Sequence, residues 1–424
     1  MRKTGRRGAG EQPVEGQPRL PLKELIWESL YQTVLQAGLV FVLEVLEAER
    51  EVVCGPRYRH DTEREAHRAG HVGSSLVLGG RRVAVRRPRV RTVDGREVDL
   101  PSWMAWSGED PLNERAVEQM VLGVSTRRYA RSLEPLPEPM EESGTSKSSV
   151  SRRFIQGTEK KLAELMSRDL SGLDLVAIYI DGLHFHGHVV VVAVGVTSEG
   201  KKVVLGLWEG ATENAATCKA LLEDLGDRGL RTDRALLVVI DGSKALAKAV
   251  KAIFGARALI QRCQVHKVRN VVDQLSKEKQ ESVKSTMNQA YRTTDSARSK
   301  QLLENLARSL EREHPGAAAS LREGLEETLT VKGLGLSGTL ERTFSTTNLA
   351  ENLNGNVRQT SQRVKRWRGG LMILRWCAAG MLDAEKHFRR VRGHKEMPKL
   401  VEALRAHDAE LDGNVTPNSA VIAA

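Results

Sequence analysis

The chain has 424 residues, of which 40% are hydrophobic and 28% are charged, so it can form two or three domains with a sizeable buried core. Its formal net charge of +11 predicts attraction to a polyanion, and nucleic acid is the commonest one, although ribosomal and membrane-surface proteins can be equally basic. The apolar runs are too short to span a membrane, so we expect no membrane partner. The basic start, residues 1–20, lacks the apolar core of a signal peptide and predicts a disordered tail.

The cysteines indicate the compartment. Cys54, Cys218, Cys263 and Cys377 are far apart and form no CxxC pair. This spacing argues against a disulfide framework and a zinc ribbon, and it fits a reducing environment. We therefore expect a cytoplasmic protein, associated with the nucleoid if its polyanion is DNA.

Residues 21–110 are expected to contain N-terminal helices and a basic β-hairpin region. Between residues 20 and 51 the apolar side chains recur at helical spacing. From Ser75 to Leu100, short valine-rich runs alternate with a Gly-Gly and an Asp-Gly turn, which is typical of hairpins. The arginines of this stretch predict a basic sheet surface.

Residues 111–168 are predicted to form a helix-turn-helix-like DNA-binding region. One helix is expected to end at Gly123, and a later one begins after a serine cap, either Ser146 or Ser148. The predicted DNA contacts in its first turns are Lys147, Arg152 and Arg153. An ordinary amphipathic helix with a solvated basic face remains an alternative.

From residue 169 onward the pattern predicts the order β-β-β-α-β-α-β-α, an α/β arrangement with a mixed sheet flanked by helices, as in ribonuclease H-like folds. We expect the first part of such a catalytic domain over residues 169–276 and a helical insertion over 277–340. A final catalytic helix with a basic segment follows over 341–395, and a C-terminal tail over 396–424.

Two aspartates follow buried strands, Asp181 in "YIDG" and Asp241 in "VIDG". If these strands are neighbours, their carboxyl ends bring the two acids close together. Two close carboxylates repel each other unless a cation neutralises them, and oxygen ligands suit Mg²⁺ or Mn²⁺. The alternative is that each Asp-Gly pair begins a turn or caps the next helix.

A third carboxylate, Glu351, stands in "TTNLAENLNG". On a helix that begins near Asn348, the stripe of Leu349, Leu353 and Val357 faces the core, and Glu351 points to another face. A capping box, in which Glu351 reaches back to the backbone amide of Asn348, is the structural alternative.

A basic segment follows this helix, with an aromatic residue, Trp367, that is available for stacking. Cations next to an aromatic side chain are typical of DNA-backbone binding. The predicted DNA-binding residues are Arg358, Arg363, Lys365, Arg366 and Arg368. The alternatives are that the cations form an ordinary solvated face and that Trp367 packs in the fold, as a single tryptophan more often does.

These motifs resemble those of the Mutator-type bacterial insertion-sequence transposases, which carry a DDE triad on a ribonuclease H-like domain. The resemblance rests on "YIDGLH" at Asp181, "VIDGSKAL" at Asp241, "QRCQVHKVRN" with Cys263 and His266, and "STTNLAENLN" with Glu351. The motifs occur in the family order over roughly residues 170–390. Ala350 and Asn352 flank the glutamate where the family usually has isoleucine and serine.

The resemblance implies that Asp181, Asp241 and Glu351 are catalytic and bind two Mg²⁺ or Mn²⁺ ions, with Asp181 between them. It further implies that water cuts the transposon end and that the freed 3′-hydroxyl attacks target DNA. The partners are then double-stranded DNA, as terminal inverted repeats and target, and at least a second copy of the chain. Cys263 and His266 are expected beside the site through packing and hydrogen bonds, since zinc would need two further ligands.

Other functions remain open at this point. A ribonuclease H-like nuclease or resolvase would share the triad but stop at hydrolysis, and an inactive transposase-derived protein would only bind DNA. The sequence "HKVR" from His266 to Arg269 also fits the HxxR of tyrosine recombinases, for which Tyr291 is the nucleophile candidate.

Overall fold

The computed structural model describes residues 22–59, 63–108, 111–136, 140–185, 187–210, 212 and 214–413. The expected N-terminal tail, residues 1–20, lies outside the described residues. The chain divides into two compact units. Unit 1 comprises the chain up to Ala116 together with Thr126–Ser151, and unit 2 comprises Val117–Ser125 together with the chain from Arg152.

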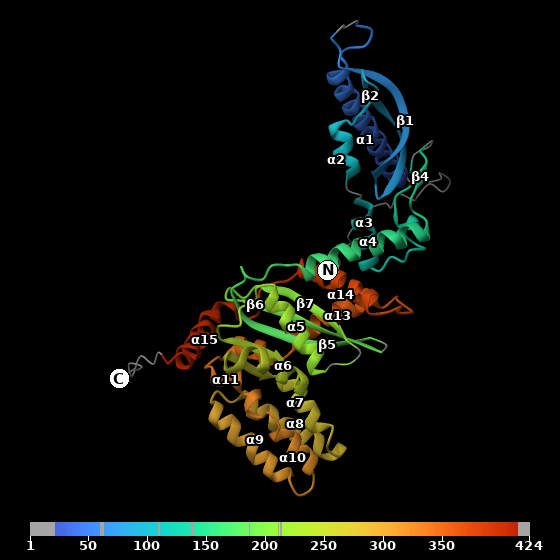
Figure 1. Ribbon diagram of the computed structural model, residues 1–424. Coiled ribbons are helices and arrows are strands. Elements are labelled where there is room, and N and C mark those ends of the chain that lie inside the picture. The colour runs from blue at the N-terminus through green and yellow to red at the C-terminus, as the bar shows by residue number, and fades with distance from the viewer. Residues whose placement is uncertain are drawn as a thin grey trace, which may run out of the picture. The chain divides into compact units, whose positions relative to one another are not determined.

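Unit 1 is built on a long helix and a small antiparallel sheet (Figure 1). Its elements are α1 (Leu22–Cys54), β1 (Ala66–Leu78), β2 (Arg81–Thr92), β3 (Glu97–Val98), α2 (Pro101–Gly108) and β4 (Glu142–Ser143). The Gly-Gly turn joins β1 to β2, and Gly79 and Gly80 both have positive φ, which glycine adopts without steric cost. Leu46, Val90 and Trp103 belong to its core. The predicted hairpin is thus present, and within the described residues from 22 onward the helix before it is α1.

Two helices contribute residues to both units, α3 (Pro111–Val121) and α4 (Lys147–Met166). Residues 122–146 separate them and include the short helix η1 (Ala130–Ser132) and β4. A helix-turn-helix joins its helices by a turn of about 3–4 residues, so α3 and α4 are not connected in that way. The DNA-binding role of this region stays a prediction.

Unit 2 contains a five-stranded mixed sheet in the order β7-β6-β5-β8-β9. The strands are β5 (Leu175–Phe185), β6 (His188–Thr197), β7 (Lys202–Gly210), β8 (Leu236–Ile240) and β9 (Ala258–Arg262). The first three pair antiparallel, whereas β5, β8 and β9 are parallel. The intervening helices are α5 (Ala215–Asp227) and α6 (Lys244–Phe254), and α7 (Gln264–Val272) follows β9. The predicted order of strands and helices is confirmed.

Helices cover both faces of this sheet (Figure 1). Along β5, Ile178 and Ile180 pack in one core with α5 and α6, while Ala177 and Tyr179 pack in the other. The second core contains side chains from α12 (Gly338–Phe344), α13 (Asn348–Ser361), α14 (Gly370–Glu385) and α15 (Met397–Leu411). Because side chains alternate along a strand, the residue after Ile180 belongs to the face covered by α13.

The helical insertion forms its own core at one end of unit 2 (Figure 1). Its helices are α8 (Lys277–Arg292), α9 (Ser296–Leu310), α10 (Pro315–Arg322), the short η3 (Glu326–Thr328) and α11 (Thr330–Gly333). Tyr291, the nucleophile candidate of the recombinase alternative, is buried there and its hydroxyl lies 3.3 Å from Thr328 Oγ1. Burial raises the pKa of Tyr291 to about 12, so this tyrosine is unsuited to nucleophilic attack.

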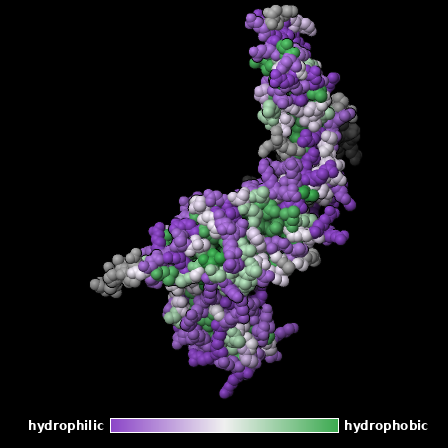
Figure 2. Space-filling model, viewed as in Figure 1, coloured by the Kyte–Doolittle hydropathy of each residue, from purple (hydrophilic) through white to green (hydrophobic). Residues whose placement is uncertain are grey.

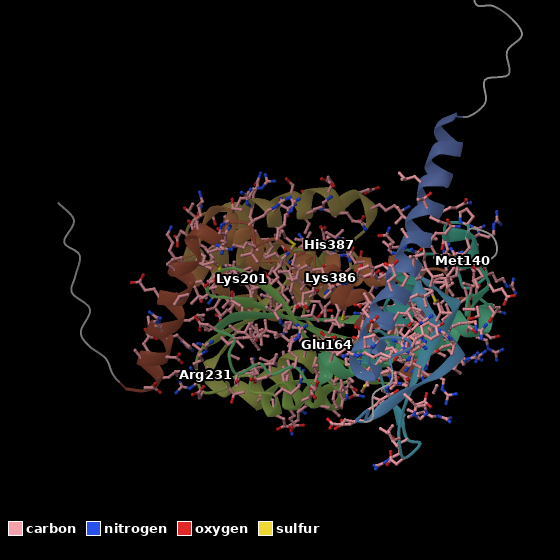
Figure 3. All side chains as sticks on the ribbon, turned by 90° about the horizontal axis from the view of Figure 1, so that it is seen from above. Met140, Glu164, Lys201, Arg231, Lys386 and His387 are labelled. Atoms are coloured by element: carbon pink, nitrogen blue, oxygen red, sulfur yellow. The ribbon has the colours of Figure 1, made fainter. Side chains whose placement is uncertain are left out.

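The C-terminal segment differs from the expected tail, because residues 397–411 form α15. Met397, Leu400 and Leu404 of this helix are buried against the sheet. The connection before it is fixed too: the Val391 backbone N–H donates to Gly200 O, at 2.9 Å, beside Lys201 in the β6–β7 turn. Figure 3 labels Lys201 and also Lys386 and His387, at the end of α14.

The surface seen in Figure 2 is mainly hydrophilic, with scattered apolar residues. Among the described residues, the structure contains no helix with the length and apolar character that crossing a bilayer requires.

Candidate active site

The parallel pair β5–β8 brings the two predicted aspartates together. Ile180 of β5 is in register with Ile240 of β8, and Asp181 and Asp241 are the next residues on the two neighbouring strands. Adjacent strands are about 4.8 Å apart, so the two aspartates start from neighbouring positions, and Asp181 continues the alternation of β5 toward the face covered by α13. Asp181 is 9% exposed, so the site lies at the edge of the core.

Asp241 also has a local structural role. Its Oδ1 accepts a hydrogen bond from the Ser243 backbone N–H, at 2.9 Å, and Ser243 in turn caps α6 by accepting from the Leu246 N–H. Asp241 therefore does begin a turn, as the structural alternative predicted, and this role occupies one of its two carboxylate oxygens. The other oxygen, Oδ2, has no such bond within the described part of the chain, which leaves it available for a metal ligand role.

Glu351 comes from α13, which packs on the same face of the sheet. Ala350, Leu353 and Val357 of α13 are buried, while the Glu351 side chain is 41% exposed. The helix begins at Asn348, with Thr347 as its N-cap residue, and Glu351 Oε1 accepts from the Thr347 hydroxyl at 2.6 Å. The predicted capping box with Asn348 is not the geometry found.

The same helix contacts Asp181 directly. Asn354, one turn after Glu351 and 2% exposed, donates from Nδ2 to Asp181 Oδ2 at 2.8 Å. Side chains three positions apart lie on one helix face. Helix α13 therefore presents the third carboxylate and holds the first one.

Burial, more than the charges of its neighbours, raises the pKa of Asp181. Burial raises this pKa to about 6, and the negative charges of Asp241 and Glu351 act in the same direction. The backbone N–H of Gly182 and the nearby His266 oppose this rise. The charged form of a buried carboxylate is destabilised by the negative charges of two other carboxylates, and a bound cation would offset this repulsion. Carboxylate oxygens are ligands that suit Mg²⁺ or Mn²⁺. The residues present thus fit the metal expected from the sequence.

Cys263 and His266 lie beside Glu351. The buried Cys263 precedes α7, and its Sγ accepts from the Thr347 backbone N–H at 3.4 Å. His266 Nδ1 is 3.3 Å from Thr347 Oγ1 and 3.7 Å from Glu351 Oε1. The hydrogen bond with Cys263 raises the pKa of His266, and the charges of Cys263 and Glu351 add to this effect. The thiol, imidazole and carboxylate ligand atoms lie within 4.8 Å of one another, so the pair forms a compact polar cluster with Glu351.

The helical pattern places Asn354 on the face of Glu351, but it predicts no role at the site for Asn354 or for Thr347. Both belong to "TTNLAENLN", and their spacing from Glu351, four residues before and three after, was the available signal.

The predicted DNA-binding cations are mostly exposed. Arg358 lies in the last turns of α13, and Arg363, Lys365, Arg366 and Arg368 lie in the segment 362–369 between α13 and α14. In α4, Lys147 and Arg152 are exposed and Arg153 is half-buried.

Of the two alternatives for Trp367, the structure shows packing. Its ring meets Phe185 edge to face, with centroids 5.0 Å apart. A cavity of about 690 Å³ opens beside this pair, and His184, Arg358 and Gln362 are among its lining residues. The cavity thus lies beside the C-terminal ends of β5 and α13, which follow Asp181 and Glu351 in the two elements.

Comparison with known proteins identifies the family of this chain. The sequence model of the Mutator family of transposases matches residues 26–390. The chain is 24% identical to the transposase for insertion sequence element IS256 in transposon Tn4001 of Staphylococcus aureus, over 80% of this chain and 87% of that protein. It is 25% identical to the transposase for element ISRM5 of Rhizobium meliloti, over 85% and 89% of the two chains. It is 26% identical to the transposase for element IS1081 of Mycobacterium tuberculosis, over 84% and 85%. The chain belongs to the Mutator family of transposases.

Proposed function

We propose that this protein is a DDE transposase that binds the terminal inverted repeats of its insertion sequence and catalyses metal-dependent cleavage and transfer of DNA strands. The observation that carries the proposal is that Asp181 and Asp241 follow Ile180 and Ile240, which are in register on neighbouring strands, and that α13, the helix of Glu351, contacts Asp181 through Asn354. The mixed sheet, antiparallel on one side of β5 and parallel on the other, supports a ribonuclease H-like catalytic domain.

The three carboxylates have the ligand chemistry of a magnesium or manganese site, and together they would hold two Mg²⁺ or Mn²⁺ ions. Such ions lower the barrier to phosphoryl transfer by stabilising charge on the attacking and leaving oxygens. The exposed cations of the segment 362–369 would bind the DNA backbone and orient the scissile phosphate. Asn354 and Thr347 hold the carboxylates of Asp181 and Glu351 through their hydrogen bonds.

The proposed reaction has two steps and needs no protein nucleophile. Water attacks the phosphorus at the transposon end, the bond to the 3′-oxygen breaks, and a 3′-hydroxyl is freed. This hydroxyl then attacks a phosphorus of target DNA, whose own 3′-oxygen leaves. Because two element ends must react together, the active species is a homodimer or a larger assembly on DNA, in the cytoplasm at the nucleoid.

The test uses the full chain with DNA that carries the ends of its own element and a target duplex. Reactions contain Mg²⁺, Mn²⁺ or EDTA, and the variants are Asp181→Ala, Asp241→Ala and Glu351→Ala. Glu199→Ala, which removes an exposed acid from the β6–β7 turn, is the matched control.

We expect wild type and the control to nick the ends and join them to target only with metal, and each triad variant to bind DNA without reacting. Cleavage without joining would identify a nuclease or resolvase, and binding without cleavage an inactive derivative. Normal cleavage by Glu351→Ala would refute the triad.

A further inference from the structure

Asn354 is a buried polar residue in the middle of an apolar helix face. It is 2% exposed, and its neighbours Leu353 and Val357 belong to the core between α13 and the sheet. Its Nδ2 donates to Asp181 Oδ2 at 2.8 Å, across 173 positions of sequence. The contact therefore joins α13 directly to the strand that carries the first carboxylate.

The carbonyl oxygen of the Asn354 side chain is not satisfied by the described protein groups around it. Among the described residues, Asn354 Oδ1 is buried and has no hydrogen-bond partner. A buried carbonyl group without a protein partner costs free energy, and an apolar residue of similar size would pack here without that cost. The amide at this position is therefore better explained by its contact with Asp181 than by the stability of the fold.

We propose that Asn354 is a positioning residue for the metal site, which fixes the orientation of the Asp181 carboxylate through Oδ2. This inference rests on the proposed function, because it assigns a role at the same site. The hydrogen bond fixes the rotation of the carboxylate about its terminal torsion, so both oxygens keep defined directions before a metal ion arrives.

The carboxamide suits this role because it donates a hydrogen bond and has no charge. A carboxylate at position 354 would add negative charge next to Asp181, which already feels Asp241 and Glu351. An ammonium group would neutralise Asp181 and compete with the metal. Asn354 holds the acid without changing the charge of the site.

The experiment measures Mn²⁺ binding to the full chain without DNA, by electron paramagnetic resonance of free Mn²⁺. A second measurement is the Mn²⁺ concentration that gives half-maximal nicking of element ends. Asn354→Leu keeps the size of the side chain and removes the donor. Asn354→Ser removes the reach to Asp181 while keeping a polar group, in case the leucine variant folds poorly. Asn352→Leu and Asn356→Leu change exposed asparagines of the same helix and are the matched controls.

We expect both Asn354 variants to bind Mn²⁺ about 10- to 100-fold more weakly, as is typical when a partner of a metal ligand is lost. Their nicking should require correspondingly more Mn²⁺ and recover when Mn²⁺ is raised, which a purely structural defect would not do. Wild-type affinity and metal requirement in either well-folded variant would overturn the inference while leaving the triad intact. If wild type itself neither binds Mn²⁺ nor nicks DNA, the proposed function fails and the inference with it.

Discussion

Replacement of Asp181 by asparagine is expected to stabilise the metal-free protein at pH 8, although it removes a proposed catalytic residue. Burial, with the charges of Asp241 and Glu351, raises the pKa of Asp181 to about 6, whereas an aspartate in an unfolded chain titrates near about 3.9. The folded protein thus binds this proton more tightly than the unfolded chain. The stability that the protonated Asp181 contributes is therefore fully present below a pH of about 3.9 and is lost as the pH rises to about 6.

The magnitude follows from the size of the shift. A difference of roughly two pKa units corresponds to about 3 kcal/mol at 1.36 kcal/mol per unit. Asparagine has no charge to bury, and its side-chain oxygen can accept the hydrogen bond that Asn354 Nδ2 now donates to Asp181 Oδ2. We expect Asp181→Asn to exceed wild type in free energy of unfolding by about 3 kcal/mol at pH 8 and by only about 1 kcal/mol at pH 4.5.

Urea denaturation in EDTA at the two pH values measures this difference. Asp273→Asn, which changes an exposed carboxylate after α7, should show no such pH-dependent difference. Addition of Mg²⁺ or Mn²⁺ should stabilise wild type, by about 2.7 kcal/mol at 100 times the dissociation constant, and should have little effect on Asp181→Asn. A difference that is the same at both pH values, or a variant less stable than wild type at pH 8, would refute the argument.

Two further predictions concern charges outside the carboxylate cluster. Glu341→Gln removes the carboxylate that lies 2.6 Å from the buried Lys332 ammonium, so we expect a loss of about 3–5 kcal/mol in urea denaturation. A loss below about 1 kcal/mol would mean that Lys332 does not depend on this ion pair. The double variant Lys365→Ala/Arg366→Ala should make the dependence of log affinity on log salt less steep, by about 2 in the magnitude of the slope. The change should be equal for element ends and for unrelated DNA. A selective loss for element ends in filter-binding or anisotropy measurements would instead show that these two residues read sequence.

The strands of unit 2 and the positions of the two aspartates could be predicted from sequence. Buried strands ending in Asp-Gly carry their own signal, and the register of Ile180 with Ile240 brings the two acids onto neighbouring strands. The role of Asn354 could not be predicted, because its partner lies 173 residues away and helical spacing shows only which residues share a face.

Tertiary packing also explains where the structure departs from the sequence expectations. Trp367 stands among cations, and only the position of Phe185, on a distant strand, shows that it packs edge to face. In residues 397–411, Met397, Leu400 and Leu404 recur at helical spacing, so the sequence carries a local signal for α15 that the expected tail overlooks. Only the face of the sheet on which these residues pack depends on the tertiary structure.

Helix α13 carries its packing residues and its polar site residues on two adjacent stripes, one residue apart in sequence. Ala350, Leu353 and Val357 anchor it in the core, whereas the neighbouring positions Glu351, Asn354 and Arg358 carry the third acid, the partner of the first acid and an exposed cation. Successive residues on a helix are turned by about 100°, so the two stripes lie side by side, and Asn354 is buried where they meet. A small rotation of α13 would therefore move Glu351 and Asn354 together relative to β5. Through Asn354, the helix that carries Glu351 is thus held to the strand that carries Asp181, across 173 positions of sequence.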